Sequence, residues 1–596
     1  MFLKAHARRK DGKAHRYYSL VESVRTTRGP QHRVLAYLGE LNTSAEKTWH
    51  KAISIFNGEG QEEQLELFPS DDSQLPSGER VVQVCLDHVR WERPRDFGDL
   101  FVAHHVWQLL GLDKLLAAEM AGSDADVPWQ LIAFILCAAR LIAPSSELAL
   151  GDSFYPRTAL DDIAGVPVEK VNKDRLYRGL DRLHPCKSAV EAHLKNRLGT
   201  LFAEPFDILL YDLTSTYFEG LAEGNPAAMR GYSRDHRPDC AQVVIGLVVT
   251  KRGLPLGYQV FDGNRNDATT LEEMMAKMEA LYGKASRIWV FDRGVASEKN
   301  LEALRAHSGA YLVGTPRVML RKVESALLDG NWQTVREGIE VKLVPAPDGS
   351  KDTFVLCRSA DRRDKEAAMH DRFERKMEDG LGRLSAAIEA GRLRSRDTLW
   401  QRIGRLKAEC SRVARAYEIT VAGDGSSLSL SWHKDAARAA YMRHSEGAYL
   451  LRTNLTGESE QELWHMYMQL NDAEAAFRKQ DLSIRPVFHQ TQRRVEAHVL
   501  VCFIAYTMYR TLDRLARDRG LEMTARKVLS TVSMIKSGDV ILPLVDGREL
   551  RLRRVSRPDR RQAEVLARLD VHLPERVGTD GFAAPVCSTD SPASIL

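Results

Sequence analysis

Two aspartates in this sequence stand where strand ends could bring them to one surface. Asp212 closes the apolar run 207–212, and Asp292 closes the apolar run 287–292. A short apolar run that ends in a polar residue is typical of a buried strand whose C-terminal end reaches a surface site. The two residues are therefore candidates for one shared acidic site.

A third carboxylate, Glu474, lies on the apolar face of a predicted helix. The residues of that face follow the first at offsets of 4, 7, 11 and 14: Leu463, Tyr467, Leu470, Glu474 and Phe477. A carboxylate on a buried helix face is costly unless something cationic compensates it. Two strand-end aspartates and one inward glutamate together indicate a site for divalent metal.

Composition describes a large protein with an ordinary soluble character. The 596 residues exceed one ordinary core, so we expect two to four domains. The 85 basic and 81 acidic residues nearly cancel, so a DNA-binding role must rest on local charge. Eight cysteines occur without a C-x-x-C pair, which favours reduced thiols in a cytoplasmic protein. The most apolar stretch, 127–143, is short for a bilayer span and predicts a core helix without a membrane role.

Shifts in composition and pattern divide the chain into eight segments. We predict a basic β-like N-terminal segment at 1–56, a linker at 57–80, a helical DNA-binding region at 81–204, a first core segment at 205–315, an insertion domain at 316–447, a second core segment at 448–515, a C-terminal α/β segment at 516–576 and a disordered tail at 577–596. The β-like segment contains strand patterns at 17–21 and 33–38, and basic residues at 8–16 suit DNA-backbone binding or a solvated terminus.

The segment 205–315 alternates strands and helices in the order β-β-β-α-β-α-β. The expected strands are 207–212, 243–250, 254–261, 287–291 and 310–313, and the expected helices are 269–282 and 297–307. This order predicts an α/β fold with a ribonuclease H-like core, a mixed sheet with flanking helices. The core lacks its final acidic helix at 315, so we expect it to resume at the strand 448–454, beyond an α+β insertion domain. Ser459 and Glu462 predict a capping box that opens the helix of Glu474.

The segment 172–183 is a candidate for DNA recognition. Its pattern places Leu176, Leu180 and Leu183 inward, with Lys173, Arg175 and Arg178 on the outer face. A helix of this kind can be the recognition helix of a helix-turn-helix unit. An ordinary solvated helix face explains the same pattern, and the two interpretations stay open.

Several stretches around the three acids resemble the DDE transposases of bacterial insertion sequences, in the group with a β-strand insertion before the last acidic residue. The matching stretches are YDLTSTYFE at 211–219, GYSRDHRPD at 231–239, VFDRG at 290–294, EAAFR at 474–478 and RPVFH at 485–489. The resemblance implies that Asp212, Asp292 and Glu474, 80 and then 182 residues apart, form the catalytic triad. It also implies cleavage at transposon ends carrying terminal inverted repeats, joining of the 3′-OH to target double-stranded DNA, and a homodimer in the synaptic complex.

The expected chemistry explains why three carboxylates are needed. Phosphodiester hydrolysis and transesterification require an activated oxygen nucleophile and a stabilised leaving oxygen, which two Mg²⁺ ions about 3.5–4 Å apart supply. Hard cations prefer carboxylate oxygen, with Mn²⁺ as the alternative ion. We assign the bridging position between the two ions to Asp212, with Asp292 and Glu474 holding one ion each.

The sequence departs from the group's tyrosine–arginine–glutamate–lysine signature at two positions. Tyr467 and Glu474 fit, but Leu470 stands at the arginine position and Asp481 at the lysine position. The stretch 477–485 also reads about two residues short, which on a helix rotates all later residues by about 200°. The alternatives are therefore a catalytically impaired or domesticated DNA-binding protein, or a metal-dependent nuclease of the same fold.

Basic residues near the acids are candidates for phosphate contact. They are Arg293, Arg478, Lys479 and Arg485, and an exposed basic face is the alternative interpretation. His489 and His498 lack companion cysteines at zinc-ligand spacing, so we expect them to pack or contact DNA rather than bind zinc.

Overall fold

The structure is a computed structural model. It describes residues 2–10, 13–26, 29–40, 82–122, 125–203, 207–233, 235–283, 287–347, 349–478, 484–577 and 581–583, with only the backbone at 7–10, 13–15, 25–26, 29–31, 39–40, 471–478 and 581–583. The chain divides into two compact units, Met1–Gln83 and Val84–Leu596. Each unit is described by itself.

The first unit contains an antiparallel sheet in the order β1-β2-β3. Its strands are β1 (Phe2–Lys10), β2 (Lys13–Thr26) and β3 (Gly29–Glu40). The strand patterns at 17–21 and 33–38 are confirmed, since they lie in β2 and β3. Leu3, Tyr18 and Val21 are buried. The predicted linker 57–80 lies outside the described residues.

The second unit begins with the strand β4 (Arg90–Asp96), which the prediction of a helical region at 81–204 did not include, and continues as helices. Its helices are α2 (Gly98–Leu109), α3 (Leu112–Glu119), α4 (Trp129–Ile142), α5 (Glu147–Ala149), α6 (Tyr155–Arg157), α7 (Leu160–Ala164), α8 (Lys173–Leu183) and α9 (Lys187–Phe202). Helix α4 is largely buried, which confirms the predicted core helix. None of the described helices could cross a bilayer alone; on length and composition only, the bent pair Trp129–Ile142 and Glu147–Arg157, at 101°, passes that test.

A large mixed sheet forms the centre of the second unit. Its order is β10-β11-β12-β15-β9-β8-β5-β6-β7. The strands are β5 (Ile208–Tyr217), β6 (Gln242–Thr250), β7 (Pro255–Asp262), β8 (Ile288–Phe291), β9 (Ala310–Gly314), β10 (Gln333–Arg336), β11 (Ile339–Val344), β12 (Thr353–Ser359) and β15 (Ala448–Thr453). Strands β5, β8 and β9 are parallel, and the other neighbouring pairs are antiparallel. The predicted chain order of strands and helices between 205 and 315 is confirmed.

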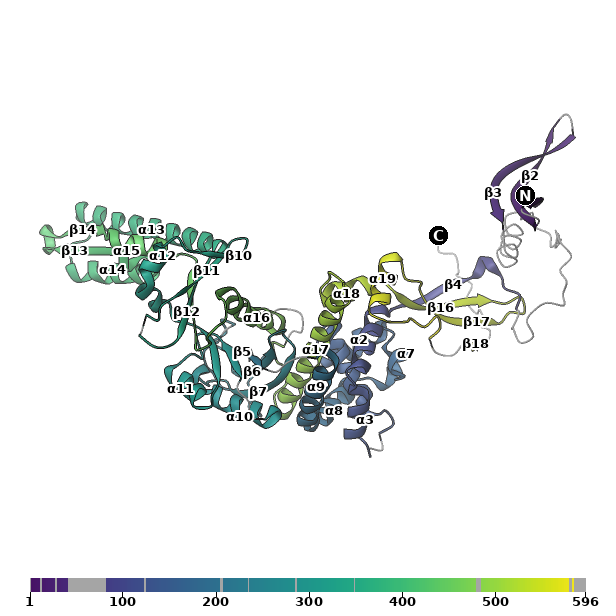
Figure 1. Cartoon of the computed structure of the whole chain (residues 1–596), viewed down its shortest axis with the longest axis horizontal. Helices are drawn as coiled ribbons and strands as arrows, with labels where there is room; N and C mark the ends of the chain where they lie inside the picture. The colour runs from purple at the N-terminus through teal and green to yellow at the C-terminus, as the bar shows by residue number, and fades with distance from the viewer. Residues whose placement is uncertain are drawn as a thin grey trace, which may run out of the picture. The chain divides into compact units, whose positions relative to one another are not determined.

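Helices cover both faces of this sheet (Figure 1). One face packs against α10 (Leu271–Tyr282) and α11 (Glu298–Ala306) through odd-numbered residues of β5 and β8, such as Leu209 and Phe291. The other face packs against α16 (Glu460–Arg478) and α17 (Gln492–Asp518) through even-numbered residues, such as Leu210 and Val290. This alternation follows from the two-residue period of a strand.

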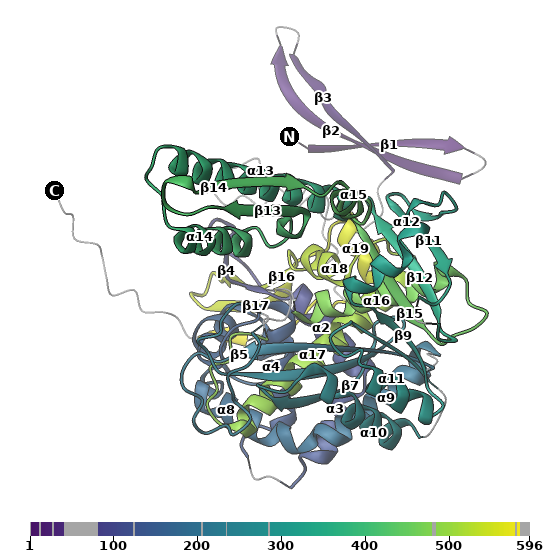
Figure 2. The same ribbon diagram turned by 90° about the vertical axis from the view of Figure 1, so that its left-hand side faces the viewer.

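The predicted insertion is less separate from the core than the sequence indicated. Its first strands, β10, β11 and β12, join the main sheet, and β12 pairs directly with β15. The rest forms an outlying layer of α13 (Ala360–Glu389), α14 (Arg396–Glu409), α15 (Ala436–His444), β13 (Tyr417–Ala422) and β14 (Ser429–Lys434). Both views show the β13–β14 hairpin between α13 and α14 (Figures 1 and 2).

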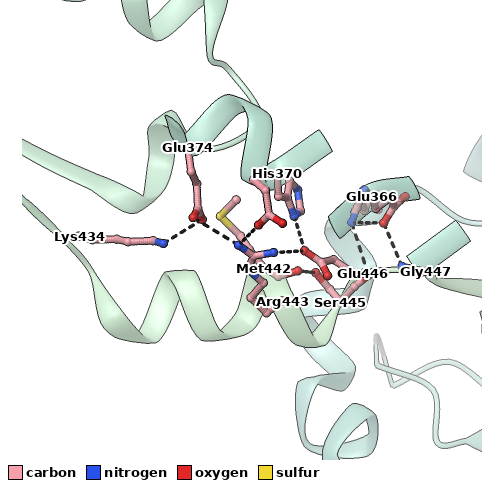
Figure 3. A network of polar contacts seen from close by, with 11 residues as sticks. Glu366, His370, Glu374, Lys434, Met442, Arg443, Ser445, Glu446 and Gly447 are labelled. Carbon is pink, nitrogen blue, oxygen red and sulfur yellow. Dashed lines mark hydrogen bonds and ion pairs between the residues drawn. The ribbon is translucent and has the colours of Figure 1, made fainter. Parts of the chain in front are cut away.

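A polar network ties α13 to the turn that precedes β15 (Figure 3). Glu366, His370 and Glu374 repeat every four residues along α13 and therefore share one face. Glu366 accepts a hydrogen bond of 3.0 Å from the Gly447 amide, and His370 contacts Glu446 at 2.6 Å. The outlying layer is thus fixed to the N-terminal end of β15, a strand of the central sheet.

The C-terminal segment contains a second sheet, with the order β18-β17-β16-β4. Its strands are β4 (Arg90–Asp96), β16 (Lys536–Pro543), β17 (Glu549–Val555) and β18 (Gly581–Ala583), beside α18 (Ala525–Val532) and α19 (Arg560–Arg568). The predicted disordered tail was wrong for 581–583, because these residues pair with β17. The rest of that tail, apart from residue 577, lies outside the described residues.

Candidate active site

Asp212 and Asp292 are brought together by strand register. Strands β5 and β8 are parallel, and Tyr211 pairs with Phe291. Asp212 and Asp292 are the next residues along each strand direction, so they lie side by side at the C-terminal end of β8. Asp212 is half-buried and Asp292 is exposed.

Both aspartates lie on the sheet face that α16 covers. They continue the even-numbered series that includes Leu210 and Val290, whose side chains pack in the core of that face. Helix α16 packs against β5 and β8. The sheet therefore presents two carboxylates toward the helix that carries the third.

Helix α16 begins as the sequence predicted. The Ser459 amide donates to Glu462 at 3.1 Å and the Glu462 amide donates to the Ser459 hydroxyl at 3.3 Å, which confirms the capping box. Leu463 and Leu470 are buried on the predicted face. Glu474 lies within the helix, two turns beyond Tyr467 and on the same side, at about 10 Å along the axis.

Tyr467 links this helix to the strand-end aspartate. Its hydroxyl donates a hydrogen bond of 3.2 Å to Asp292 Oδ1. Burial, reinforced by the Asp292 charge, raises the pKa of Tyr467 above its ordinary value, so the hydroxyl keeps its proton. A Cβ added at Gly314 would lie 2.6 Å from the Tyr467 hydroxyl and 3.3 Å from Asp292 Oδ1. The space that Gly314 leaves is what admits this contact.

A polar cavity of about 580 Å³ opens beside Asp292. Residues of α16, β15 and β9 contribute to its lining. The charged residues that line it are Asp292, Arg293, Arg317, Arg336, Arg362, Glu366 and Arg412. Local spacing gave no signal for four of these arginines, because Arg317, Arg336, Arg362 and Arg412 come from separate elements of the region predicted as an insertion.

The basic residues predicted to contact DNA near the acids differ in how exposed they are. Arg293 is exposed at the cavity, next to Asp292. Arg485 is paired with Asp235, and both side chains are mostly buried. The side chain of Arg478 and all of Lys479 lie outside the described structure.

The outer face of α8 is only partly available to DNA. Leu176, Leu180 and Leu183 are buried as predicted. Arg175 forms an ion pair of 2.7 Å with Asp126, whereas Lys173 and Arg178 are exposed. The recognition-helix interpretation therefore stays a prediction that depends on Lys173 and Arg178.

His489 and His498 meet Glu147 in a buried cluster whose candidate ligand atoms lie within 4.8 Å of one another. Its surroundings suit packing better than a metal ion, because the Arg140 guanidinium lies 3.5 Å from His498 Nδ1. Burial and Arg140 lower the pKa of His498 to about 3, so the imidazole is neutral. Burial raises the pKa of Glu147, but the hydrogen bond and charge of His489 and smaller contributions from neighbouring groups together outweigh it, and the pKa falls to about 2.

Asp212 within β5 and Asp292 just after β8, on the sheet face covered by the helix that contains Glu474, form an arrangement that suits a class of metal-dependent phosphoryl-transfer enzymes. Family comparison gives the class its name. A model described as a transposase DDE domain matches residues 207–508, just over half of the chain. The chain belongs to the DDE transposases.

The N-terminal region identifies the kind of transposase. Residues 3–64 match the N-terminal domain of IS1634 family transposases, so the protein is an insertion-sequence transposase. It is a DNA-cleaving and strand-transferring enzyme, and domains of this kind use divalent metals. No curated protein matches the chain.

Among solved structures, the chain is similar to a piggyBac transposase synaptic complex with hairpin DNA, determined by cryo-EM. The match has 8% sequence identity and a TM-score of 0.33, and it covers 75% of this chain and 82% of that chain. At this TM-score the likeness carries no argument about fold or site.

Proposed function

We propose that Asp212, Asp292 and Glu474 form the acidic site of a ribonuclease H-like core that cleaves transposon ends and joins them to target DNA. The observation that carries the proposal is the parallel register of β5 and β8, which sets Asp212 beside Asp292. Both lie on the face covered by α16, the helix that contains Glu474.

The donor set suits hard divalent cations, because carboxylate oxygen is the ligand that Mg²⁺ and Mn²⁺ prefer. Two bound ions would stabilise the charge on the attacking and leaving oxygens of phosphodiester cleavage and transfer. Asp212 lies on the interior strand β5, where it pairs with Leu247 of β6 on one side and has Asp292, the residue after β8, on the other. We assign it to both ions, and Asp292 and Glu474 to one each.

Tyr467 orients one of these carboxylates. Its hydroxyl donates to Asp292 Oδ1, which leaves Oδ2 and the second lone pair of Oδ1 for a cation. A carboxylate held in one rotamer loses less conformational entropy when it binds an ion. Tyr467 is thus a positioning residue in this proposal.

The substrate and assembly follow from the transposase class. We propose that the protein binds the terminal inverted repeats of its element as double-stranded DNA, through the N-terminal sheet and exposed basic residues such as Lys173 and Arg178. Two ends held together would require a homodimer in the synaptic complex. Its place of action would be the bacterial cytoplasm, at the nucleoid.

The decisive test replaces the carboxylate of Asp212 and leaves β5 intact. We expect Asp212→Ala to abolish Mg²⁺-dependent cleavage of a duplex carrying the element's terminal inverted repeat, with end binding largely retained. Asp207→Ala is the matched control, because Asp207 is exposed at the opposite end of β5. Undiminished cleavage by Asp212→Ala would refute the assignment. End binding by the wild type without any cleavage in Mg²⁺ or Mn²⁺ would instead favour a catalytically impaired protein.

A further inference from the structure

The cavity beside Asp292 carries an excess of positive charge. Five arginines line it against two carboxylates, Asp292 and Glu366. Arg317, Arg336, Arg362 and Arg412 all come from the segment between β9 and β15, and Arg293 follows Asp292. An opening of about 580 Å³ with this charge suits a polyanion next to the acidic site.

Two of the arginines are held by aromatic rings that are themselves joined. The Arg336 guanidinium lies 5.3 Å from the Trp464 ring, and the Arg362 guanidinium lies 5.5 Å from the Tyr449 ring. The indole N–H of Trp464 donates a hydrogen bond of 2.7 Å to the Tyr449 hydroxyl. Arginine stacked on a ring keeps its N–H donors free at the edge of the guanidinium plane. The pair is therefore positioned before any ligand arrives.

A buried carboxylate fixes a third arginine. Glu366 accepts hydrogen bonds of 3.0 Å from Arg317 and 3.1 Å from Arg362. Its third partner is the Gly447 amide, as Figure 3 shows. Because one carboxylate is shared by two arginines, the group of three side chains keeps a net positive charge. The Arg317 and Arg362 side chains are still 41% and 48% exposed, so both can donate to a ligand in the cavity.

The wall formed by α16 supplies none of this charge among its described residues. That wall consists of Trp464, Tyr467, Met468 and Leu470. Leu470 stands where the tyrosine–arginine–glutamate–lysine signature has its arginine. The cationic groups of the cavity instead face α16 from β10, α13 and the segments around them.

We propose that this cavity is a phosphate-binding subsite for the DNA strand that enters the acidic site, with Arg317, Arg336 and Arg362 as its donors. These arginines take the place of the one missing at Leu470. The bidentate fork of arginine fits phosphate oxygens, and DNA is the substrate class of the enzyme. The proposal rests on the proposed function, because it takes Asp292 as a member of the acidic site.

The test measures how binding of DNA depends on salt. The probe is a duplex that carries the element's terminal inverted repeat and its flanking DNA, bound by the full chain without divalent ions. For the double variant Arg336→Ala with Arg362→Ala, we expect about tenfold weaker binding. The slope of log affinity against log salt should fall by about 0.9 for each lost phosphate contact.

The control is Arg375→Ala, on α13 but 13 residues beyond Arg362 and so on roughly the opposite side of the helix. Arg375 is exposed and makes no ion pair with a described residue. We expect an unchanged slope for it. Arg336→Lys should keep the wild-type slope, because the charge is retained, which separates a lost contact from a folding defect.

The contacted phosphate can be located by neutral methylphosphonate substitution near the cleavage site. We expect one position to weaken binding by the wild type while leaving the double variant unaffected. The proposal is overturned if the slope of log affinity against log salt is the same for the double variant as for Arg375→Ala. It is also overturned if the double variant loses binding of free inorganic phosphate but binds DNA like the wild type. Either outcome leaves the proposed function standing when Asp212→Ala still abolishes cleavage, so the two failures are distinguishable.

Discussion

The central sheet places acids and arginines by two different means. In its inner region, the parallel strands β5 and β8 set Asp212 beside Asp292 through backbone register alone. In its outer region, β10 and the helix after β12 supply Arg336 and Arg362, whose positions depend on aromatic rings and on Glu366. The acidic side of the site is thus a property of the sheet, whereas the basic side is a property of side-chain contacts. Substitutions should therefore damage the two sides in different ways.

Among substitutions that leave the three acids in place, the largest effect is expected from filling the space beside Asp292. Gly314→Ala would put a Cβ 2.6 Å from the Tyr467 hydroxyl and displace it from Asp292. Because misplacement of a catalytic group by about 1 Å costs on the order of 100-fold, we expect that loss in the single-turnover cleavage rate. Gly330→Ala is the control, since a Cβ there meets no atom within 4 Å. Equal rates for the two variants would show that the Tyr467–Asp292 contact is dispensable.

On the basic side, a substitution should affect the stability of the fold more than the rate of cleavage. Glu366→Gln removes the charge shared by Arg317 and Arg362, and we expect the free energy of unfolding to fall by about 2 kcal/mol, discounted because both arginines are half exposed. Urea unfolding measures this change. Glu389→Gln, exposed on the same helix, is the control.

The effect of Glu366→Gln should depend on pH. Burial raises the pKa of Glu366, but the Gly447 amide and the two arginines outweigh it and hold the pKa below its ordinary value of 4.5. The carboxylate therefore stabilises the fold above pH 4.5, and this contribution is lost as the pH falls through the lowered pKa. The difference in free energy of unfolding between the wild type and Glu366→Gln should therefore become smaller below pH 4.5. A gap that widens on acidification would contradict the pairing.

The smallest effect is expected from removing a single hydroxyl. Tyr467→Phe loses one hydrogen bond to Asp292, and a net hydrogen bond of about 1 kcal/mol corresponds to about fivefold in the cleavage rate. DNA affinity measured without divalent ions should not change, because the acidic side does not hold the DNA backbone. A matching loss of affinity would mean that Tyr467 belongs to the binding surface instead.

The sequence was informative where local pattern determines placement. Apolar runs before Asp212 and Asp292 identified two strands, although β5 continues past Asp212 to Tyr217, where the predicted end was wrong. The helix face of Glu474 was visible at offsets of 4 and 7. The capping box at Ser459 also followed from local spacing. Each of these depends on residues within a few positions of one another, which is the range of strand and helix periodicity.

Contacts between distant segments were beyond that range. The pairing of β12 with β15 joins residues about a hundred positions apart, so the insertion appeared more separate than it is. The ion pair of Arg175 with Asp126, 49 positions apart, was likewise not visible in the sequence. Side-chain pairing across long loops leaves no periodic trace in a sequence.

The most direct measurement of the acidic site exchanges a hard ligand for a soft one. Asp292→Cys replaces carboxylate oxygen with a thiolate, which Mg²⁺ binds poorly and softer divalent ions bind better. We expect cleavage of the transposon end by this variant to be lost in Mg²⁺, by about 1000-fold or several kcal/mol in the barrier, and partly restored in Mn²⁺. Wild-type cleavage by Asp292→Cys in Mg²⁺ would contradict the assignment of Asp292 as a metal ligand.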